Sequence, residues 1–320
     1  MFFLKLRMYL LLIVLFAIIY SVVSMVAYAM GISNFYFYII FSFLMLFIQY
    51  MIGPKIVEWS MGVRYIKEGE YSELRTMVAN LAHAAEIPVP RIGVSEISLP
   101  NAFAFGRWKK DGRICVTRGI LNLVDRDELR AVLGHEMSHL KNRDVLTITL
   151  LSVIPFVLYR IAFSILFYRR RDERSGSAVM LVGVAALILY FVSNLLVLYA
   201  SRIREYFADR GSVKLGNPPH KLASALYKLV YGSARTPKEE LRQVEGLKAF
   251  FVNDPSSAAK EFSELKQLDL DKSGTLDRQE LNFLNNKKLN LNFGDKLMEL
   301  MSTHPNMLKR IKQLSSYAQA

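Results

Sequence analysis

The chain has 320 residues, a formal net charge of +13, a hydrophobic content of 52% and a mean hydropathy of +0.22. Charged residues still make up 22%, which excludes a chain that lies wholly within a membrane. The composition predicts membrane-spanning segments joined to a polar domain. Beside long apolar runs, the basic charge favours membrane lipid over nucleic acid as the partner. The single cysteine, Cys115, excludes intrachain disulfides.

Residues 1–54 predict an N-terminal transmembrane hairpin. No charged residue occurs over 8–54, and a helix needs about 20 apolar residues to cross a bilayer, so this stretch holds two crossings. Lys5 and Lys55 flank it, which places both ends in the cytoplasm by the positive-inside rule. A cleaved signal peptide ending at the Ala-Tyr-Ala of 27–29 is the alternative, but the apolar run is too long for one.

Residues 145–200 predict a second hydrophobic hairpin, with apolar segments at 145–167 and 177–200. The linker between them contains four arginines, which the positive-inside rule keeps in the cytoplasm. Arg160, within the first segment, is costly in lipid. Full spanning and partial entry are both open. In either case the hairpin leaves and returns on one side of the membrane.

The polar stretches 55–144 and 201–320 predict the two parts of one domain. In the first part, apolar residues at helical spacing predict a helix over 71–85. Short strands are expected at 91–97, 101–107 and 113–117. The second part has a largely helical pattern. The expected fold is therefore mainly α with a small β-sheet, of the α+β class.

The segment Gly-His-Glu-Met-Ser-His carries the most specific chemical signal in the chain. Asp125 and Glu128 have the spacing of a capping box, which predicts a helix that continues through this segment. On a helix, His135 and His139 share one face and can direct two imidazoles at one zinc ion. Glu136 is offset to the side, where it can activate a water at the zinc and return the proton to the leaving amine.

Topology predicts the third zinc ligand. His139 lies six residues before the second hairpin and Glu205 lies five residues after it. At about 1.5 Å per helical residue, both lie about 8–9 Å from the same boundary, so antiparallel helices can present them at matching height. Two histidines and Glu205 then hold one zinc with an open fourth position. Asp209 can orient a ligand histidine by accepting its second ring proton, and Asp144 is the alternative for that role.

The histidine segment, the Arg-Glu-Tyr-Phe-Ala-Asp of 204–209 and the hairpin between them resemble the HtpX family of membrane zinc metallopeptidases. The N-terminal hairpin, residues 101–106 and the Ser-Thr-His-Pro of 302–305 with Arg310 match that family too. The resemblance implies a gluzincin-like, zincin-type peptidase domain with the same three ligands and catalytic glutamate. It implies a multi-pass protein of a prokaryotic plasma membrane, with its active site in the cytoplasm and damaged or misfolded membrane proteins as substrates.

Two further places are predicted to contact the substrate. Asn101, Ala102 and Ala104 lie in an expected edge strand that can pair with an extended peptide backbone, with a purely structural strand as the alternative. His304 precedes a proline and can act in catalysis by stabilising the tetrahedral oxyanion, or it can contact the metal region. A structural histidine is the alternative there.

Residues 269–280 follow the pattern of an EF-hand calcium loop, which the HtpX-like pattern lacks. Gly274 stands at the turn, and segments 259–268 and 278–289 can form the flanking helices of an EF-hand-like segment. EF-hands usually pair, and only one loop is present, so a metal-free helical insertion is the alternative. The predicted calcium ligands are Asp269, Asp271, Ser273, Thr275, Asp277 and Glu280.

The sequence thus predicts a zinc-dependent membrane endopeptidase that binds one zinc ion and acts on protein or peptide substrates. Residues 55–144 and 201–320 are the two parts of its peptidase domain. Calcium is a second expected metal. The alternative is a calcium-responsive membrane scaffold or sensor with a non-catalytic metal site, against which the intact Glu136 argues.

Overall fold

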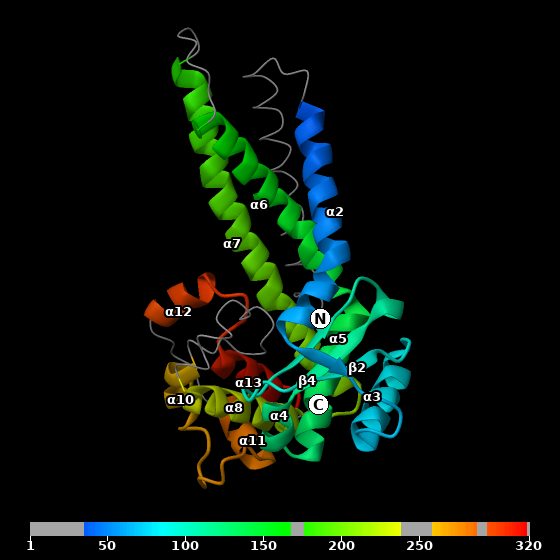
Figure 1. The fold of residues 1–320 in the computed structure, drawn as a ribbon. Coiled ribbons are helices and arrows are strands. Elements are labelled where there is room, and N and C mark those ends of the chain that lie inside the picture. Colours follow the sequence, from blue (N-terminus) through cyan, green and yellow to red (C-terminus); the bar gives the residue numbers. More distant parts are fainter. Residues whose placement is uncertain (1–34, 168–175, 238–257, 287–292, 319–320) are drawn as a thin grey trace. The chain divides into compact units, whose positions relative to one another are not determined.

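The structure is a computed structural model that describes residues 35–167, 176–237, 258–286 and 293–318 (Figure 1). Helices predominate over these residues, and four short strands form one mixed sheet. The predicted class, mainly α with a small β-sheet, is confirmed at this level. The chain divides into two compact units, one apolar and one polar.

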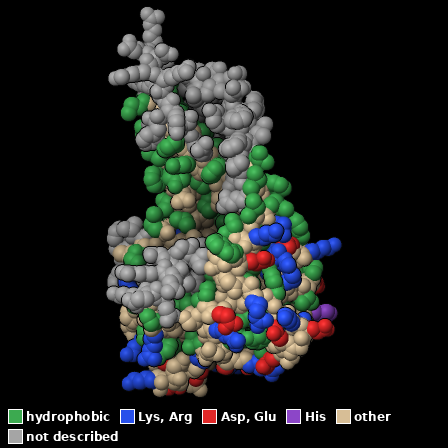
Figure 2. Space-filling view, viewed as in Figure 1, with side chains coloured by type: hydrophobic (Ala, Val, Ile, Leu, Met, Phe, Trp, Pro, Cys, Tyr) green, Lys and Arg blue, Asp and Glu red, His purple; other side chains and the backbone are tan. Residues whose placement is uncertain are grey.

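The apolar unit consists of Leu146–Ile203 and the described residues up to Ile52, and the polar unit consists of Gly53–Val145 and the described residues from Arg204 onward. Hydrophobic side chains cover the visible helices of the apolar unit, whereas Lys, Arg, Asp and Glu side chains gather on the polar unit (Figure 2). Charge and hydrophobicity are therefore segregated between the two units.

Three long helices carry most of the described apolar sequence: α2 (Phe35–Ser60), α6 (Asp144–Phe167) and α7 (Gly176–Lys214). Among the described residues, α6 and α7 are long and apolar enough to cross a membrane, by length and composition. Apolar side chains of both helices form one cluster that includes Leu158, whereas Leu181 is 69% exposed. The first predicted crossing of the N-terminal hairpin and the linker with four arginines lie outside the described residues.

The sheet of the polar unit has the strand order β1-β2-β4-β3, with β2 and β4 parallel and the other pairs antiparallel. The three predicted strands are confirmed, the first two with shorter bounds and the third with the predicted bounds, and β3 lies at one edge of the sheet. A fourth strand, β1, escaped prediction because three residues are too few to show an alternating pattern. The strands are β1 (Val63–Tyr65), β2 (Arg91–Ser95), β3 (Ala102–Phe105) and β4 (Arg113–Thr117).

Helix α5 (Arg126–Asn142) contains the histidine segment, as predicted. Its capping box is confirmed: the Asp125 carboxylate accepts from the Glu128 N–H at 2.8 Å, and the Glu128 carboxylate accepts from the Asp125 N–H at 2.8 Å. Arg143 ends the helix in the left-handed conformation, with φ of 56°. Helix α6 begins at the next residue, so the chain turns between α5 and the apolar hairpin rather than continuing as one helix.

Helix α8 (Pro219–Arg235) occupies the centre of the polar unit's core, where it packs against α5 and against α10 and α13. Helix α3, which confirms the helix predicted at 71–85, packs on α5. The other elements of the polar unit are the 3-10 turn Lys109–Asp111 and the helices α3 (Ser72–Ala85), α4 (Arg118–Leu123), α10 (Ala258–Leu265), α11 (Arg278–Asn286), α12 (Phe293–Leu300) and α13 (Met307–Ser315).

Candidate metal centre

Helix α5 approaches the polar end of α7 and the loop after it very closely at two glycines. A Cβ atom added to Gly134 would lie 2.2 Å from the side chain of Asn217, and one added to Gly211 would lie 2.0 Å from Ser138 Oγ. Atoms cannot approach this closely, so any larger residue would force the segments apart. Gly134 directly precedes His135, and the close approach therefore brings the histidine segment against α7.

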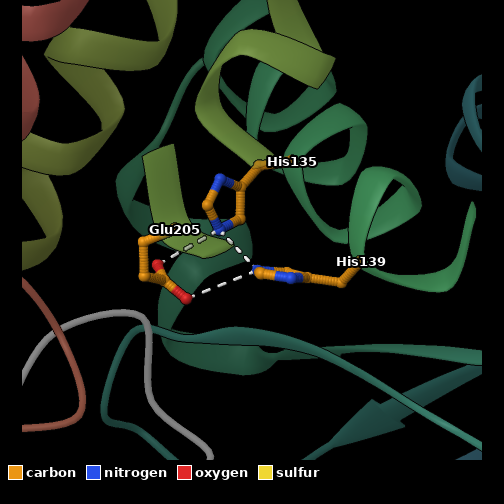
Figure 3. A group of neighbouring side chains, drawn as sticks. All are labelled: His135, His139 and Glu205. Atoms are coloured by element: carbon orange, nitrogen blue, oxygen red, sulfur yellow. Dashed lines mark hydrogen bonds and ion pairs between the residues drawn. The ribbon is translucent and has the colours of Figure 1, made fainter. Parts of the chain in front are cut away.

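Three side chains converge where these helices meet (Figure 3). His135 Nε2 and His139 Nε2 lie 3.1 Å apart. Glu205, on α7, has one carboxylate oxygen 3.5 Å from His135 Nε2 and the other 3.5 Å from His139 Nε2. The structure thus brings together the two histidines and the distant carboxylate that the hairpin topology had suggested.

Each histidine also meets an aspartate through its other ring nitrogen. His135 Nδ1 lies 2.8 Å from Asp209 Oδ1, and His139 Nδ1 lies 2.6 Å from Asp144 Oδ2. The sequence offered Asp209 and Asp144 as alternatives for a single orienting role, whereas the structure places one against each ring. Ionised carboxylates only accept hydrogen bonds, so each Nδ1 carries the donated proton. Both Nε2 lone pairs are then left facing Glu205.

The donor set fits a zinc ion. Two imidazole nitrogens and a carboxylate are ligands that zinc favours, and ligands about 2.0–2.1 Å from a tetrahedral zinc lie roughly 3.3–3.4 Å from one another. The observed separations of 3.1 and 3.5 Å bracket that value. The nearby carboxylates of Asp209 and Glu205 overcome the opposing effect of burial and raise the pKa of His135 to about 9. The site therefore attracts positive charge, and a bound metal ion would replace that proton.

Arg310 holds the carboxylate side of the site. Its side chain is fully buried, donates from Nε and Nη2 to the two oxygens of Asp209 at 3.0 and 2.7 Å, and lies 3.0 Å from Glu205 through Nη1. Burial alone would raise the pKa of Glu205, but the charge of Arg310 overcomes it and lowers that pKa well below its ordinary value. The contacts of Arg310 could not be predicted from the sequence, because Arg310 and Asp209 lie 101 positions apart in the chain.

A second arginine holds the other orienting aspartate. Arg204 forms an ion pair with Asp144 and also donates to the main-chain carbonyl of Asn142 at 3.2 Å. Burial lowers the pKa of Arg204 to about 10. Each histidine of the site is thus linked through an aspartate to a buried or nearly buried arginine.

Glu136 lies beside the histidines and is 4% exposed. Burial raises its pKa, in opposition to the charges of His135 and His139. The backbone N–H of Ala104, in the edge strand β3, donates a hydrogen bond to it. A buried carboxylate with a raised pKa is suited to accept and return a proton.

The other predicted contact residues differ in their surroundings. The main chain of Asn101 is already paired with Thr117. The Asn101 N–H donates to the Thr117 hydroxyl at 2.8 Å, and the Asn101 carbonyl accepts from the Thr117 N–H at 2.9 Å. The free edge is therefore formed by Ala102–Phe105 instead. His304 lies just before α13 and its Nδ1 is 3.0 Å from Thr303 Oγ1. Burial lowers the pKa of His304 although the charge of Glu205 acts to raise it.

The EF-hand-like loop lies apart from these residues in the chain. One carboxylate oxygen from each of Asp269, Asp271 and Glu280 can be chosen so that all lie within 4.8 Å of one another. Asp277 instead accepts from the Glu280 N–H at 2.8 Å, at the start of α11. Helices α10 and α11 flank the loop, but α10 ends at Leu265, before the predicted end at 268. Helix α11 covers 278–286 of the predicted 278–289, and the last three residues of that prediction lie outside the described residues.

Comparison with known proteins gives concordant results. The family model described as Peptidase family M48 matches residues 68–318. A Protease HtpX homolog of Methanothermobacter thermautotrophicus is 54% identical over 227 residues, covering 71% of this chain and 86% of its own length. A Protease HtpX homolog of Moorella thermoacetica is 36% identical over 283 residues, covering 86% of this chain and 82% of its own length. The solved structure of S. mikatae Ste24p shares the fold with a TM-score of 0.51 at 16% identity, over 98% of this chain and 67% of that one.

Proposed function

Since this chain belongs to peptidase family M48, among its HtpX-like members, we propose that it is a zinc-dependent membrane endopeptidase. His135, His139 and Glu205 bind the zinc ion, one per chain, and Glu136 is the catalytic residue. The observation that carries the proposal is the convergence of two Nε2 atoms and one carboxylate at the spacing of zinc ligands. Bound zinc supplies a Lewis acid that lowers the pKa of a water and polarises the scissile carbonyl.

Residues of this chain would then carry the proton transfers. Glu136 accepts a proton from the attacking water and delivers it to the leaving amine, as its raised pKa and its position beside the histidines favour. His304 donates to the developing oxyanion, and its electrostatic interaction with Glu205 supports a place near the metal ligands. The edge strand at Ala102–Phe105, whose Ala104 N–H reaches Glu136, positions an extended substrate backbone.

Membrane attachment would place this site near membrane-protein substrates. We propose four parts: an N-terminal hairpin at 1–54, peptidase segments at 55–144 and 201–320, and a second hairpin at 145–200. Exposed apolar side chains on α6 and α7 support membrane contact for the second hairpin. The charge pattern around the first hairpin supports a peptidase domain that faces the cytoplasm. The HtpX relatives from prokaryotes support a prokaryotic plasma membrane, where the protein would hydrolyse damaged or misfolded membrane proteins.

A test uses the full chain, purified in detergent without chelators, together with the Glu136→Gln variant. Bound zinc and cleavage of an unfolded model protein are measured on both. We expect one zinc ion per chain in both proteins and cleavage by the parent alone. Glu68→Gln, the same change at an exposed glutamate, serves as the control and should cleave like the parent. A parent that binds zinc but cleaves nothing would favour the scaffold or sensor with a non-catalytic site.

A further inference from the structure

The loop at 269–280 carries the donor order of a calcium site and folds accordingly. Aspartates stand at positions 1, 3 and 9 and glutamate at position 12, while Gly274 at position 6 has φ of +78°, a conformation that favours glycine. The donors at positions 1, 3 and 12 converge to within 4.8 Å although ten residues lie between the first and the last. Sequence order and spatial convergence therefore agree.

No basic side chain among the described residues neutralises these carboxylates. Among the described residues, no lysine or arginine forms an ion pair with Asp269, Asp271 or Glu280, although Glu280 is only 7% exposed. Their partners are backbone N–H groups of the loop, the Ser273 side chain and the Tyr227 hydroxyl, which donates to Asp269 at 3.3 Å. Like charges held this close favour a bound cation, and an all-oxygen set with a glutamate at position 12 suits calcium.

The structure also shows what replaces the second EF-hand that usually completes such a unit. Leu265 of α10 and Leu281 of α11 are fully or almost fully buried and belong to the core that surrounds α8. Leu276, at loop position 8, is 3% exposed in the same core. The peptidase core therefore covers the apolar face that a partner EF-hand would cover, which explains how a single loop can be folded.

The loop is tied to the helix that carries the catalytic segment. The Leu276 N–H donates to Ser224 Oγ at 3.2 Å, and Ser224 Oγ in turn donates to Glu128 Oε1 at 2.6 Å. Glu128 closes the capping box at the start of α5. The Ser224 hydroxyl group therefore links the loop to the N-terminus of α5.

We propose that residues 269–280 form a calcium site, with oxygen ligands from Asp269, Asp271 and Glu280 at its centre, and that bound calcium stabilises the polar unit. Ser273 and Asp277 and the main chain of Thr275 complete the ligand set. The site is separate from the zinc centre and does not depend on the proposed peptidase activity. An unpaired loop should bind with a dissociation constant of about 10 µM to 1 mM, from the weak end of the calcium sensors through the range of extracellular modules.

The direct test is calcium titration of the full chain in detergent, with zinc bound, followed by calorimetry. We expect one calcium ion per chain and at least a tenfold weaker affinity in Glu280→Gln, which removes the charge of the position 12 ligand. The same addition of calcium should raise the melting temperature of the parent by about 2–4 °C and leave that of Glu280→Gln unchanged. Glu68→Gln, with the same charge change outside the loop, should bind calcium like the parent.

A second measurement covers the case in which Glu280→Gln does not fold. Terbium can take the place of calcium and emits when a nearby tyrosine is excited, and Tyr227 lies against Asp269. Excitation should give terbium emission that calcium displaces, and Tyr227→Phe should reduce the emission while leaving calcium affinity within about twofold. Absence of calorimetric calcium binding by the folded parent would overturn the proposal. Equal binding by the parent and a folded Glu280→Gln variant would also overturn it.

Discussion

Asp144 Oδ2 lies 2.6 Å from Nδ1 of His139. Asp144 directly follows Arg143, the left-handed residue that ends α5. The break at Arg143 turns the chain so that the first residue of α6 can face the last turn of α5. A straight continuation of α5 would carry Asp144 away from His139, because residues five apart lie on different faces of a helix. The helix break therefore helps to build the site.

Asp144→Asn should weaken zinc binding about 10- to 100-fold, because an amide is a poorer acceptor for the Nδ1 proton and holds the ring less firmly. The same loss is expected for Asp209→Asn at the other histidine. Competition with a chromogenic chelator measures both affinities. Glu68→Gln, which loses an exposed carboxylate outside the metal-binding group, is the control. Unchanged zinc affinity in both aspartate variants would show that the rings need no such partner.

Arg310→Met should destabilise the polar unit by about 3–5 kcal/mol, because it leaves Asp209 and Glu205 buried without their counter-charge. Adding Asp209→Asn should recover part of that loss, since one of the uncompensated charges is removed. Denaturant unfolding of the two single variants and the double variant gives the coupling between the positions. Strictly additive effects would contradict the ion-pair interpretation.

Gly211→Ala should destabilise the polar unit by about 1–3 kcal/mol, since the added methyl group would lie 2.0 Å from Ser138 Oγ. It should also weaken zinc binding, because α7 would shift relative to α5. Gly53→Ala, where no atom lies within 4 Å of the added methyl group, is the control for an alanine in a helix and should not destabilise. Thermal unfolding of both variants decides between local overlap and a general glycine effect.

Cys115 should be unreactive toward maleimide in the folded protein. Its side chain is fully buried in β4, and burial raises the pKa of the thiol, so little thiolate is present to attack. Because that pKa is higher in the folded than in the unfolded chain, the contribution of this thiol to the free energy of unfolding falls as the pH rises above about 8.5. Rapid labelling should appear only in denaturant, whereas Glu68→Cys should label at once in native protein.

Local sequence signals were enough for the elements that position the histidines. The capping box fixed the start of α5, the spacing of His135 and His139 placed both on one face, and alternating apolar residues located three strands. The position of Glu205 also followed, since a hairpin that returns to its own side brings its flanking residues together. These are local or topological rules, and they do not require side-chain packing.

The contacts of Arg310, Arg204 and Ser224 could not be predicted in this way. Each joins segments far apart in sequence, and each depends on how helices rotate against one another in the folded core. The choice between Asp144 and Asp209 was open for the same reason, because it depends on the turn at Arg143. The glycines at 134 and 211 carried the available signal for the close approach, but a glycine alone does not reveal its neighbour.

Zinc-edge anomalous diffraction from crystals of the full chain tests the proposed metal centre most directly. We expect one strong peak about 2.0–2.2 Å from His135 Nε2, His139 Nε2 and a carboxylate oxygen of Glu205. A peak bound to the two histidines with Glu205 turned away, or no peak at this position, would contradict the proposed site.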